Sequence, residues 1–239
     1  MHNFSKMVFL LLIIISSKMV IAQPSASKIL QNVERVIMEV TDYTVDVQIN
    51  VDMERLKIPK NQAILYFKIP NKYHIESKQF VLIPREGIAN DPVLWKEKFN
   101  CKLEGQEKND TTTLYRLKLT AKDPKARMQQ LFVWVDASNW TVSKVESIPY
   151  ERRKLSAQFK QALYEGKYYL PSQIVLKFES EGQPPQQPQS GINLESDIAQ
   201  YTPDMQRGMR SGTITISYFN YRINTGLDDS IFEKKSEEK

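Results

Sequence analysis

Two neighbouring acids near the end of the chain are the first candidates for chemistry. Asp228 and Asp229 lie in INTGLDDSIF, residues 223 to 232. Two carboxylates can act together as a general acid and a nucleophile or base. Neighbours on an extended chain, however, point to opposite sides, and acids that follow a glycine such as Gly226 commonly accept backbone N–H hydrogen bonds in a turn. We therefore interpret the pair as part of a turn and Glu237-Glu238 as part of a solvated tail.

Histidine and cysteine offer little more. His2 falls in the N-terminal segment 1–22, which has the features of a signal peptide, and this leaves His74 and Cys101. One His and one Cys cannot build a zinc site, or a nucleophile pair with a third orienting group. His74 alternates with Lys72 and Glu76, which places it on the polar face of a strand, and we interpret Cys101 as a small buried or half-buried apolar residue. We therefore expect no catalytic residue, metal or cofactor, and a protein that is not an enzyme.

Residues 1–22 resemble a secretory signal peptide in three respects. Lys6 precedes an unbroken apolar run, Met7 to Ile15, which is shorter than the roughly 20 residues needed to span a bilayer. Val20 and Ala22 provide small residues at the −3 and −1 positions of a cleavage site. The alternative is an uncleaved membrane anchor, which Lys18 keeps open. We predict cleavage after Ala22 and export to the periplasm.

Charge and cysteine content narrow the class of protein. Removing residues 1–22 takes away two of the 33 basic residues and no acid, which leaves a net charge of about +3. The basic residues are spread along the chain, so we expect no nucleic-acid binding. Cys101 is the only cysteine and cannot form an internal disulfide. Export without disulfides is typical of a bacterial envelope protein.

One helix and one strand stand out in the pattern of apolar residues. A helix capped by Ser25 or Ser27 should run to about Val40, with its apolar residues on one face. The next segment alternates strictly between apolar and polar residues from Tyr43 to Glu54. A period of two predicts an antiparallel strand with one dry and one wet face.

The rest of the chain is predicted to consist mostly of strands. We expect them at 63–69, 73–83, 99–106, 114–121, 131–136, 141–147, 172–180 and 212–223. Residues 155–167 fit either a short helix or a curved strand. Residues 183–211 are rich in Pro, Gln and Gly and are expected to form an exposed, largely unstructured insertion. The predicted organisation is a signal peptide (1–22), a single domain (23–232) and a charged tail (233–239).

A sheet of this size needs more cover than one helix provides. Nine or ten strands at about 4.8 Å spacing make a sheet some 45 Å across, whereas a helix of roughly 15 residues is about 22 Å long. The sheet must therefore close into a barrel, curl over a lined cavity or receive a second helix, which DPVLWKEK (91–98) can supply with Trp95 inward. The alternative is an ordinary packed core without a cavity. The candidate apolar lining comprises Val33, Val36, Ile37, Val40, Val45, Val47, Ile49, Val51, Leu65, Phe67 and Trp95.

Four segments, in this order, resemble a known family: FKIPNKYHIES (67–77), LFVWVDASNWTVSKVE (131–146), YLPSQI (169–174) and INTGLDDSIF (223–232). The family is that of the LolA-like outer-membrane lipoprotein carriers, also called outer-membrane lipoprotein-sorting proteins. The ending is its most specific part, because the family similarly has Asn, Gly, an acid pair and Phe there. The chain departs from the family pattern at Ile69, where carriers often have arginine, and at VLIPREGIAND (81–91), which stands in place of an internal Asp-Gly and Trp-x-Tyr-Asp segment.

The resemblance implies a mainly β (α+β) protein: a half-open antiparallel β-barrel with an amphipathic helical lid over an apolar cavity. It also implies a soluble periplasmic carrier or chaperone that shields the acyl chains of lipoproteins or lipids, receiving them from inner-membrane donor proteins and passing them to outer-membrane acceptors. The mechanism would be desolvation of acyl chains, not covalent chemistry. The alternative is an envelope-stress or scaffolding protein that uses the same fold to bind a partner protein.

Overall fold

The computed structural model describes residues 23–53, 56–57, 59–70, 72–77, 92–108, 112–126, 128–147, 153–180 and 211–233. Strands dominate this part of the chain. They are β1 (Asp42–Met53), β2 (Leu56–Lys57), β3 (Asn61–Lys68), β4 (Lys72–Glu76), β5 (Phe99–Lys108), β6 (Thr113–Ala121), β7 (Gln130–Asp136), β8 (Val142–Ser147), β9 (Arg153–Tyr164), β10 (Tyr168–Ser180) and β11 (Ser211–Ile223).

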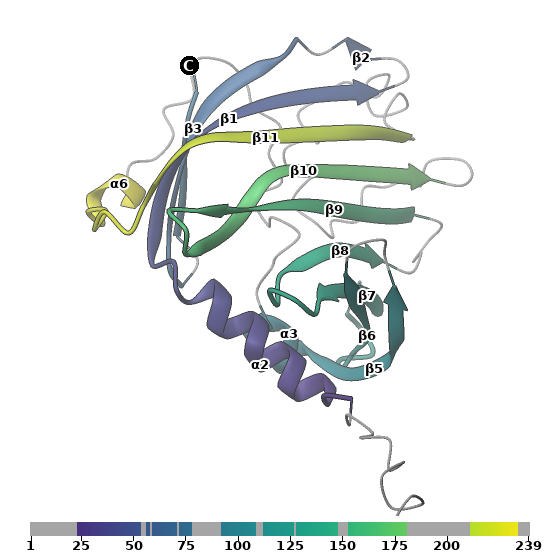
Figure 1. Ribbon diagram of the computed structural model, residues 1–239. Coiled ribbons are helices and arrows are strands. Elements are labelled where there is room, and N and C mark those ends of the chain that lie inside the picture. The colour runs from purple at the N-terminus through teal and green to yellow at the C-terminus, as the bar shows by residue number, and fades with distance from the viewer. Residues whose placement is uncertain are drawn as a thin grey trace, which may run out of the picture.

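All eleven strands belong to one antiparallel sheet. Its order is β4-β3-β1-β11-β10-β9-β8-β7-β6-β5, and β2 pairs with β1 off this path. Strands that follow one another in the chain are therefore mostly neighbours, with one long-range pairing between β1 and β11. The sheet curls so that β5 to β8 turn back below β9 (Figure 1), and β4 and β5 are its two edges. The protein is thus a mainly β, half-open antiparallel barrel, as expected.

Three helices accompany the sheet: α2 (Ala26–Ile37), α3 (Pro92–Lys98) and α6 (Ser230–Glu233). The hydroxyl of Ser25 accepts a hydrogen bond from the Lys28 amide and caps α2. Helix α2 lies across the open side of the curled sheet (Figure 1) and contacts α3, β5 and β10. Short α6 packs against edge strand β4. None of the helices in the described part of the chain is long and apolar enough to cross a bilayer.

Alternation along β1 explains how the sheet faces its core. Val45, Val47 and Ile49 are at most 2% exposed, whereas Asn50 and Asp52, which alternate with them, are exposed. The predicted two-faced strand is therefore confirmed. One large apolar cluster joins the inward side chains of the sheet to Ile29, Leu30 and Val33 of α2 and to Trp95 of α3.

The ambiguous segment 155–167 is a strand for most of its length, because β9 runs to Tyr164 and a turn follows at 165–167. Ala157 and Phe159 point inward beside Leu176 and Ile174 of β10. The insertion predicted at 183–211 and the signal peptide predicted at 1–22 lie outside the described residues, except Ser211, which begins β11. Both stay predictions.

Candidate functional site

The acid pair Asp228-Asp229 makes two separate sets of contacts. Asp228 accepts a hydrogen bond from the Ser230 amide at 2.8 Å. Asp229 accepts from the ammonium groups of Lys68 at 2.7 Å and Lys72 at 2.9 Å. Hydrogen bonding by the Ser230 side chain and then its amide lowers the pKa of Asp228, and hydrogen bonding by Lys68 and Lys72 lowers the pKa of Asp229. Both acids are therefore held ionised in structural roles, and neither is poised as a proton donor.

A buried carboxylate that was not predicted from the sequence fixes this C-terminal turn. Asp42 is 3% exposed and accepts hydrogen bonds from the amides of Thr225 at 2.8 Å and Gly226 at 3.1 Å. Asn224 has a φ of 54°. Its side-chain oxygen accepts a hydrogen bond from the Thr41 backbone amide at 2.7 Å, and its side-chain NH2 group donates one to the Glu39 carbonyl. The start of β1 and the end of β11 are thus joined by a polar network.

Phe232 contributes less to this turn than its place in the motif suggests. It is half-buried, and α6 has no buried residue. Lys68 instead connects β3 to the turn, because its ammonium group donates both to the Leu227 carbonyl at 2.7 Å and to Asp229. Lys68 of β3 and Lys72 of β4 thus add ionic and hydrogen-bonded contacts between the ending and the sheet.

The other chemistry-bearing residues are placed as structural groups. His74 lies on the convex face beside Tyr66 and 3.6 Å from Glu76, although its side chain is only 11% exposed. Cys101 is half-buried, and burial raises the pKa of its thiol to about 11. Within the described ranges no group of His, Cys, Asp and Glu has the arrangement of a metal site.

The predicted apolar lining is brought together on the concave face. Nine of its eleven members are buried, and Ile37 and Phe67 are half-buried: the buried members are Val33, Val36, Val40, Val45, Val47, Ile49, Val51, Leu65 and Trp95. Val40 belongs to a smaller cluster with Leu170 and Ile223. Burial of this extent fits both a packed core and a site that α2 closes, so the ligand cavity stays a prediction.

The other half of the concave face was not among the residues predicted from the sequence. Strands β6 to β8 contribute six further side chains with at most 3% exposure: Leu117, Leu119, Val133, Val135, Val142 and Val145. On β6 and β7 these residues alternate with outward ones, so a period of two was the available signal there. On β8, Val142 and Val145 are three residues apart because the register with β7 is irregular at this point. The apolar surface therefore extends from β3 to β6, around the curl of the sheet.

Helices α2 and α3 are linked to each other by an ion pair. The Lys96 ammonium group donates to a Glu34 carboxylate oxygen, and both side chains are partly buried. The buried face of α2 is apolar: Ile29, Leu30, Val33 and Val36. Side-chain packing and the Glu34–Lys96 ion pair thus help to hold α2 on the open side of the sheet.

A row of aromatic rings crosses five strands on the concave face. This aromatic row consists of Tyr73, Phe67, Tyr43, Tyr221 and Tyr164, with Tyr218 beside Tyr221. Ring centroids are 5.0 Å apart from Tyr73 to Phe67 and from Phe67 to Tyr43, then 5.4 Å to Tyr221 and 4.7 Å to Tyr164. Tyr73 at one end of the row, on the edge strand, is 52% exposed, whereas Tyr218 beside Tyr221 is 9% exposed.

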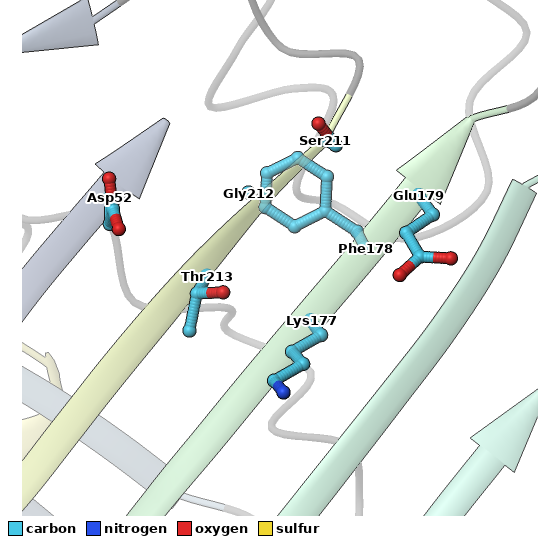
Figure 2. A pocket seen from close by; sticks show the side chains of 7 residues that line it. All are labelled: Asp52, Lys177, Phe178, Glu179, Ser211, Gly212 and Thr213. Atoms are coloured by element: carbon cyan, nitrogen blue, oxygen red, sulfur yellow. The ribbon is translucent and has the colours of Figure 1, made fainter. Parts of the chain in front are cut away.

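A polar recess of about 270 Å³ lies at the opposite end of β1, β10 and β11 (Figure 2). Asp52, Thr213 and Lys177 line it as register neighbours on three strands. The Phe178 ring of β10 lies over its register neighbour Gly212 of β11. A Cβ added to Gly212 would come within 2.8 Å of this ring and of the Met53 side chain. Most of the side chains that line the recess are polar or charged, and Phe178, which also packs against the apolar core, is the exception.

Comparison with known proteins supports the fold. No family model matches the chain, and no curated protein matches it. Among solved structures, a domain described as an outer membrane lipoprotein-sorting protein from Vibrio parahaemolyticus aligns with a TM-score of 0.58 at 12% identity, covering 87% of this chain and 97% of that one. A LolA superfamily protein from Nitrosomonas europaea gives 0.53 at 14% identity, covering 89% and 99%. A DUF1329 family protein from Desulfovibrio piger gives 0.56 at 14%, covering 88% and 98%. The chain has a LolA-like fold.

Proposed function

We propose that the protein is a soluble, non-catalytic periplasmic carrier that shields the acyl chains of lipoproteins or lipids on the concave face of its sheet. The observation that supports this most directly is the way α2 covers that face. Its side chains Ile29, Leu30 and Val33 are at most 2% exposed and belong to the same apolar cluster as the inward residues of the sheet. A helix held in this way can be replaced by another apolar surface of similar size.

Binding would exchange one apolar cover for another. When α2 moves outward, its own apolar stripe and that of the sheet become exposed, and an acyl chain in the gap removes both from water. Each buried methylene contributes about 0.8 kcal/mol, so a chain of about twelve carbons can offset the exposure of several side chains. The Glu34–Lys96 ion pair links α2 to α3, and it would keep the lid closed when no ligand is bound.

The cellular setting belongs to the same proposal. The proposal includes cleavage after Ala22 and a single domain over 23–232. It also includes passage of the cargo from inner-membrane to outer-membrane proteins. N-terminal sequencing of the mature protein should return Gln23 as its first residue. The fold likeness to a lipoprotein-sorting domain supports this setting.

A displacement experiment with matched peptides tests the function. Protein stripped of lipid by organic extraction is loaded with the apolar fluorophore 1-N-phenylnaphthylamine. A triacylated N-terminal lipoprotein peptide should displace the probe, and the same peptide without acyl chains should not. If both peptides bind equally, the protein recognises a partner chain, as the scaffolding alternative requires. Failure of the probe and of both peptides to bind would refute the carrier proposal.

A further inference from the structure

The aromatic row places several tyrosine hydroxyls close together inside the curl of the sheet. Tyr43 lies opposite Phe67 in the pairing of β1 with β3, and Tyr218 lies opposite Val47 in the pairing of β11 with β1. Tyr43 and Val47 are an even number of residues apart on β1, so all four side chains lie on the concave face. The rings of Tyr43 and Tyr218 both pack against Tyr221, with centroid distances of 5.4 Å and 6.2 Å. They come from strands far apart in the sequence.

Two of these hydroxyls lack a partner in the part of the chain that the structure describes. The Tyr221 hydroxyl donates a hydrogen bond to the Pro171 carbonyl at 2.8 Å. Tyr218, only 9% exposed, and half-buried Tyr43 make ring contacts but no hydrogen bond with a described residue. Neither hydroxyl oxygen is fully enclosed by the described residues, so a small ligand can reach each of them. A ligand that accepts hydrogen bonds at this point would pair with both.

The surroundings of these hydroxyls define the chemistry of such a ligand. Burial is the main reason that the pKa values of Tyr43, Tyr218 and Tyr221 lie well above the ordinary tyrosine value, and neighbouring tyrosines are the other causes. The hydroxyls therefore stay protonated and act as donors at neutral pH. Among the described residues, only other tyrosines act on these hydroxyls by charge, and a charged headgroup would need a compensating partner there. The site suits a neutral acceptor.

We propose that the hydroxyls of Tyr43 and Tyr218 bind the ester or amide carbonyl that joins an acyl chain to its uncharged headgroup. This inference rests on the proposed function, because the acyl chain of the ligand would lie on the apolar face beyond Tyr218. Tyr218 is followed inward by Ile216 and Ile214 on the same face of β11. Tyr73, which is 52% exposed on edge strand β4, marks the side at which the headgroup would remain near water.

Two amphiphiles that differ at one group test the inference. 1-Monolauroylglycerol has an ester carbonyl, and 1-O-dodecylglycerol has the same chain and headgroup with an ether instead. Their affinities are measured by displacement of 1-N-phenylnaphthylamine from the delipidated protein. We expect the ester to bind about three- to tenfold more tightly, the ratio that one or two neutral hydrogen bonds provide.

Substitutions identify the hydroxyl responsible. Tyr218→Phe keeps the ring and should reduce the ester preference towards a ratio of about one, while affinity for the ether is unchanged. Tyr43→Phe should act in the same direction. Tyr221→Phe is the matched control, since its hydroxyl already binds Pro171, and it should keep the wild-type ratio. A further readout is thermal stability: Tyr218→Phe removes an unpaired group and should not lower the midpoint of the ligand-free protein.

The outcomes separate this inference from the proposed function. If the probe binds and both amphiphiles displace it equally in the wild type, the tyrosine site is refuted and the carrier function stands. Equal loss of ester and ether binding in Tyr218→Phe, together with a lower midpoint, would mean that the hydroxyl is structural, and would also overturn the inference. If neither the probe nor either amphiphile binds, the proposed function fails and this inference fails with it.

Discussion

Glu34 of α2 and Lys96 of α3 form an ion pair across the open side of the barrel, between residues 62 positions apart in the chain. It is a polar link between the two helices that cover the apolar face, and both of its side chains keep some exposure to water, 29% for Glu34 and 37% for Lys96. A pair of this kind can be broken at low energetic cost. That property suits a lid that must open and close.

Breaking this pair should change ligand entry more than stability. Glu34→Gln removes the charge and keeps the shape, so the free energy of unfolding should fall by no more than about 1 kcal/mol. Association of 1-N-phenylnaphthylamine with the delipidated protein, followed by stopped-flow fluorescence, should become faster. Glu39→Gln is the control, because Glu39 pairs with Arg35 within the same helical segment and not with α3. Identical association rates in the two variants would count against a lid held by this pair.

The network around Asp42 should contribute strongly to stability. Asp42→Ala leaves the amides of Thr225 and Gly226 without their buried acceptor, and we expect a loss of about 1–3 kcal/mol in the free energy of unfolding. Asp52→Ala, on the exposed face of the same strand, should change it by less than about 0.5 kcal/mol. Urea denaturation of both variants measures the difference. Comparable small losses would show that the turn is held elsewhere.

Backbone conformation at Gly226 makes a separate contribution to the same turn. Its φ is +75°, so Gly226→Ala should cost about 1–2 kcal/mol even though nothing lies within 4 Å of an added Cβ. Gly105 also has open space for a Cβ but has no such φ, and Gly105→Ala should be neutral or slightly stabilising. Urea midpoints that fall equally in both variants would argue against strain as the cause.

Stability should decline at alkaline pH because several groups are buried in their uncharged forms. Burial raises the pKa of Cys101 to about 11 and that of Tyr218 still higher, whereas the unfolded chain ionises at about 8.5 and 10 at these groups. The unfolded state therefore loses protons first. Stability should be constant up to about pH 8.5 and fall as the pH rises further. Buried Tyr218 should contribute up to about 1.4 kcal/mol per pH unit above pH 10, and half-buried Cys101 less, because solvent screens its thiolate. Urea midpoints from pH 7 to 10.5 check this, and Tyr218→Phe should show a shallower decline above pH 10. A parallel decline would contradict the assignment.

Much of the fold could be predicted because its strands have one wet and one dry face. The alternation in β1 identified its inward residues, and Ser25 located the start of α2. The segment that forms β9 was harder to assign, since its sequence RKLSAQFKQALY is rich in Lys, Gln, Ala and Leu, which also favour a helix. The burial of Trp134 could not be predicted from the alternation either. Trp134 lies on the convex face, yet it is only 6% exposed because the Lys144 ammonium group covers its ring at 4.5 Å.

The candidate site was less accessible to sequence reasoning because its parts meet only in three dimensions. The apolar residues of α2 and β1 could be identified from their periods. The aromatic row could not, because Tyr43, Tyr164 and Tyr218 come from three separate strands and are joined only by the pairing of β1 with β11 and the order of the sheet. For the same reason, no local pattern pointed to the contacts of Asp42 with Thr225 or of Glu34 with Lys96.

Tryptophan fluorescence gives the most direct measurement of whether acyl chains occupy the concave face. Trp95 is buried in the apolar cluster under α2, whereas Trp134 lies on the convex face against Arg116 and Lys144. One variant, Trp134→Phe with Trp140→Phe, keeps only Trp95, and another, Trp95→Phe with Trp140→Phe, keeps only Trp134; circular dichroism confirms that each is folded. Each delipidated variant is titrated with a monoacylglycerol whose chain carries bromine, a quencher that acts at short range. We predict saturable quenching of Trp95 and none of Trp134. No quenching of Trp95, or equal quenching of both, would contradict a carrier that holds acyl chains on its concave face.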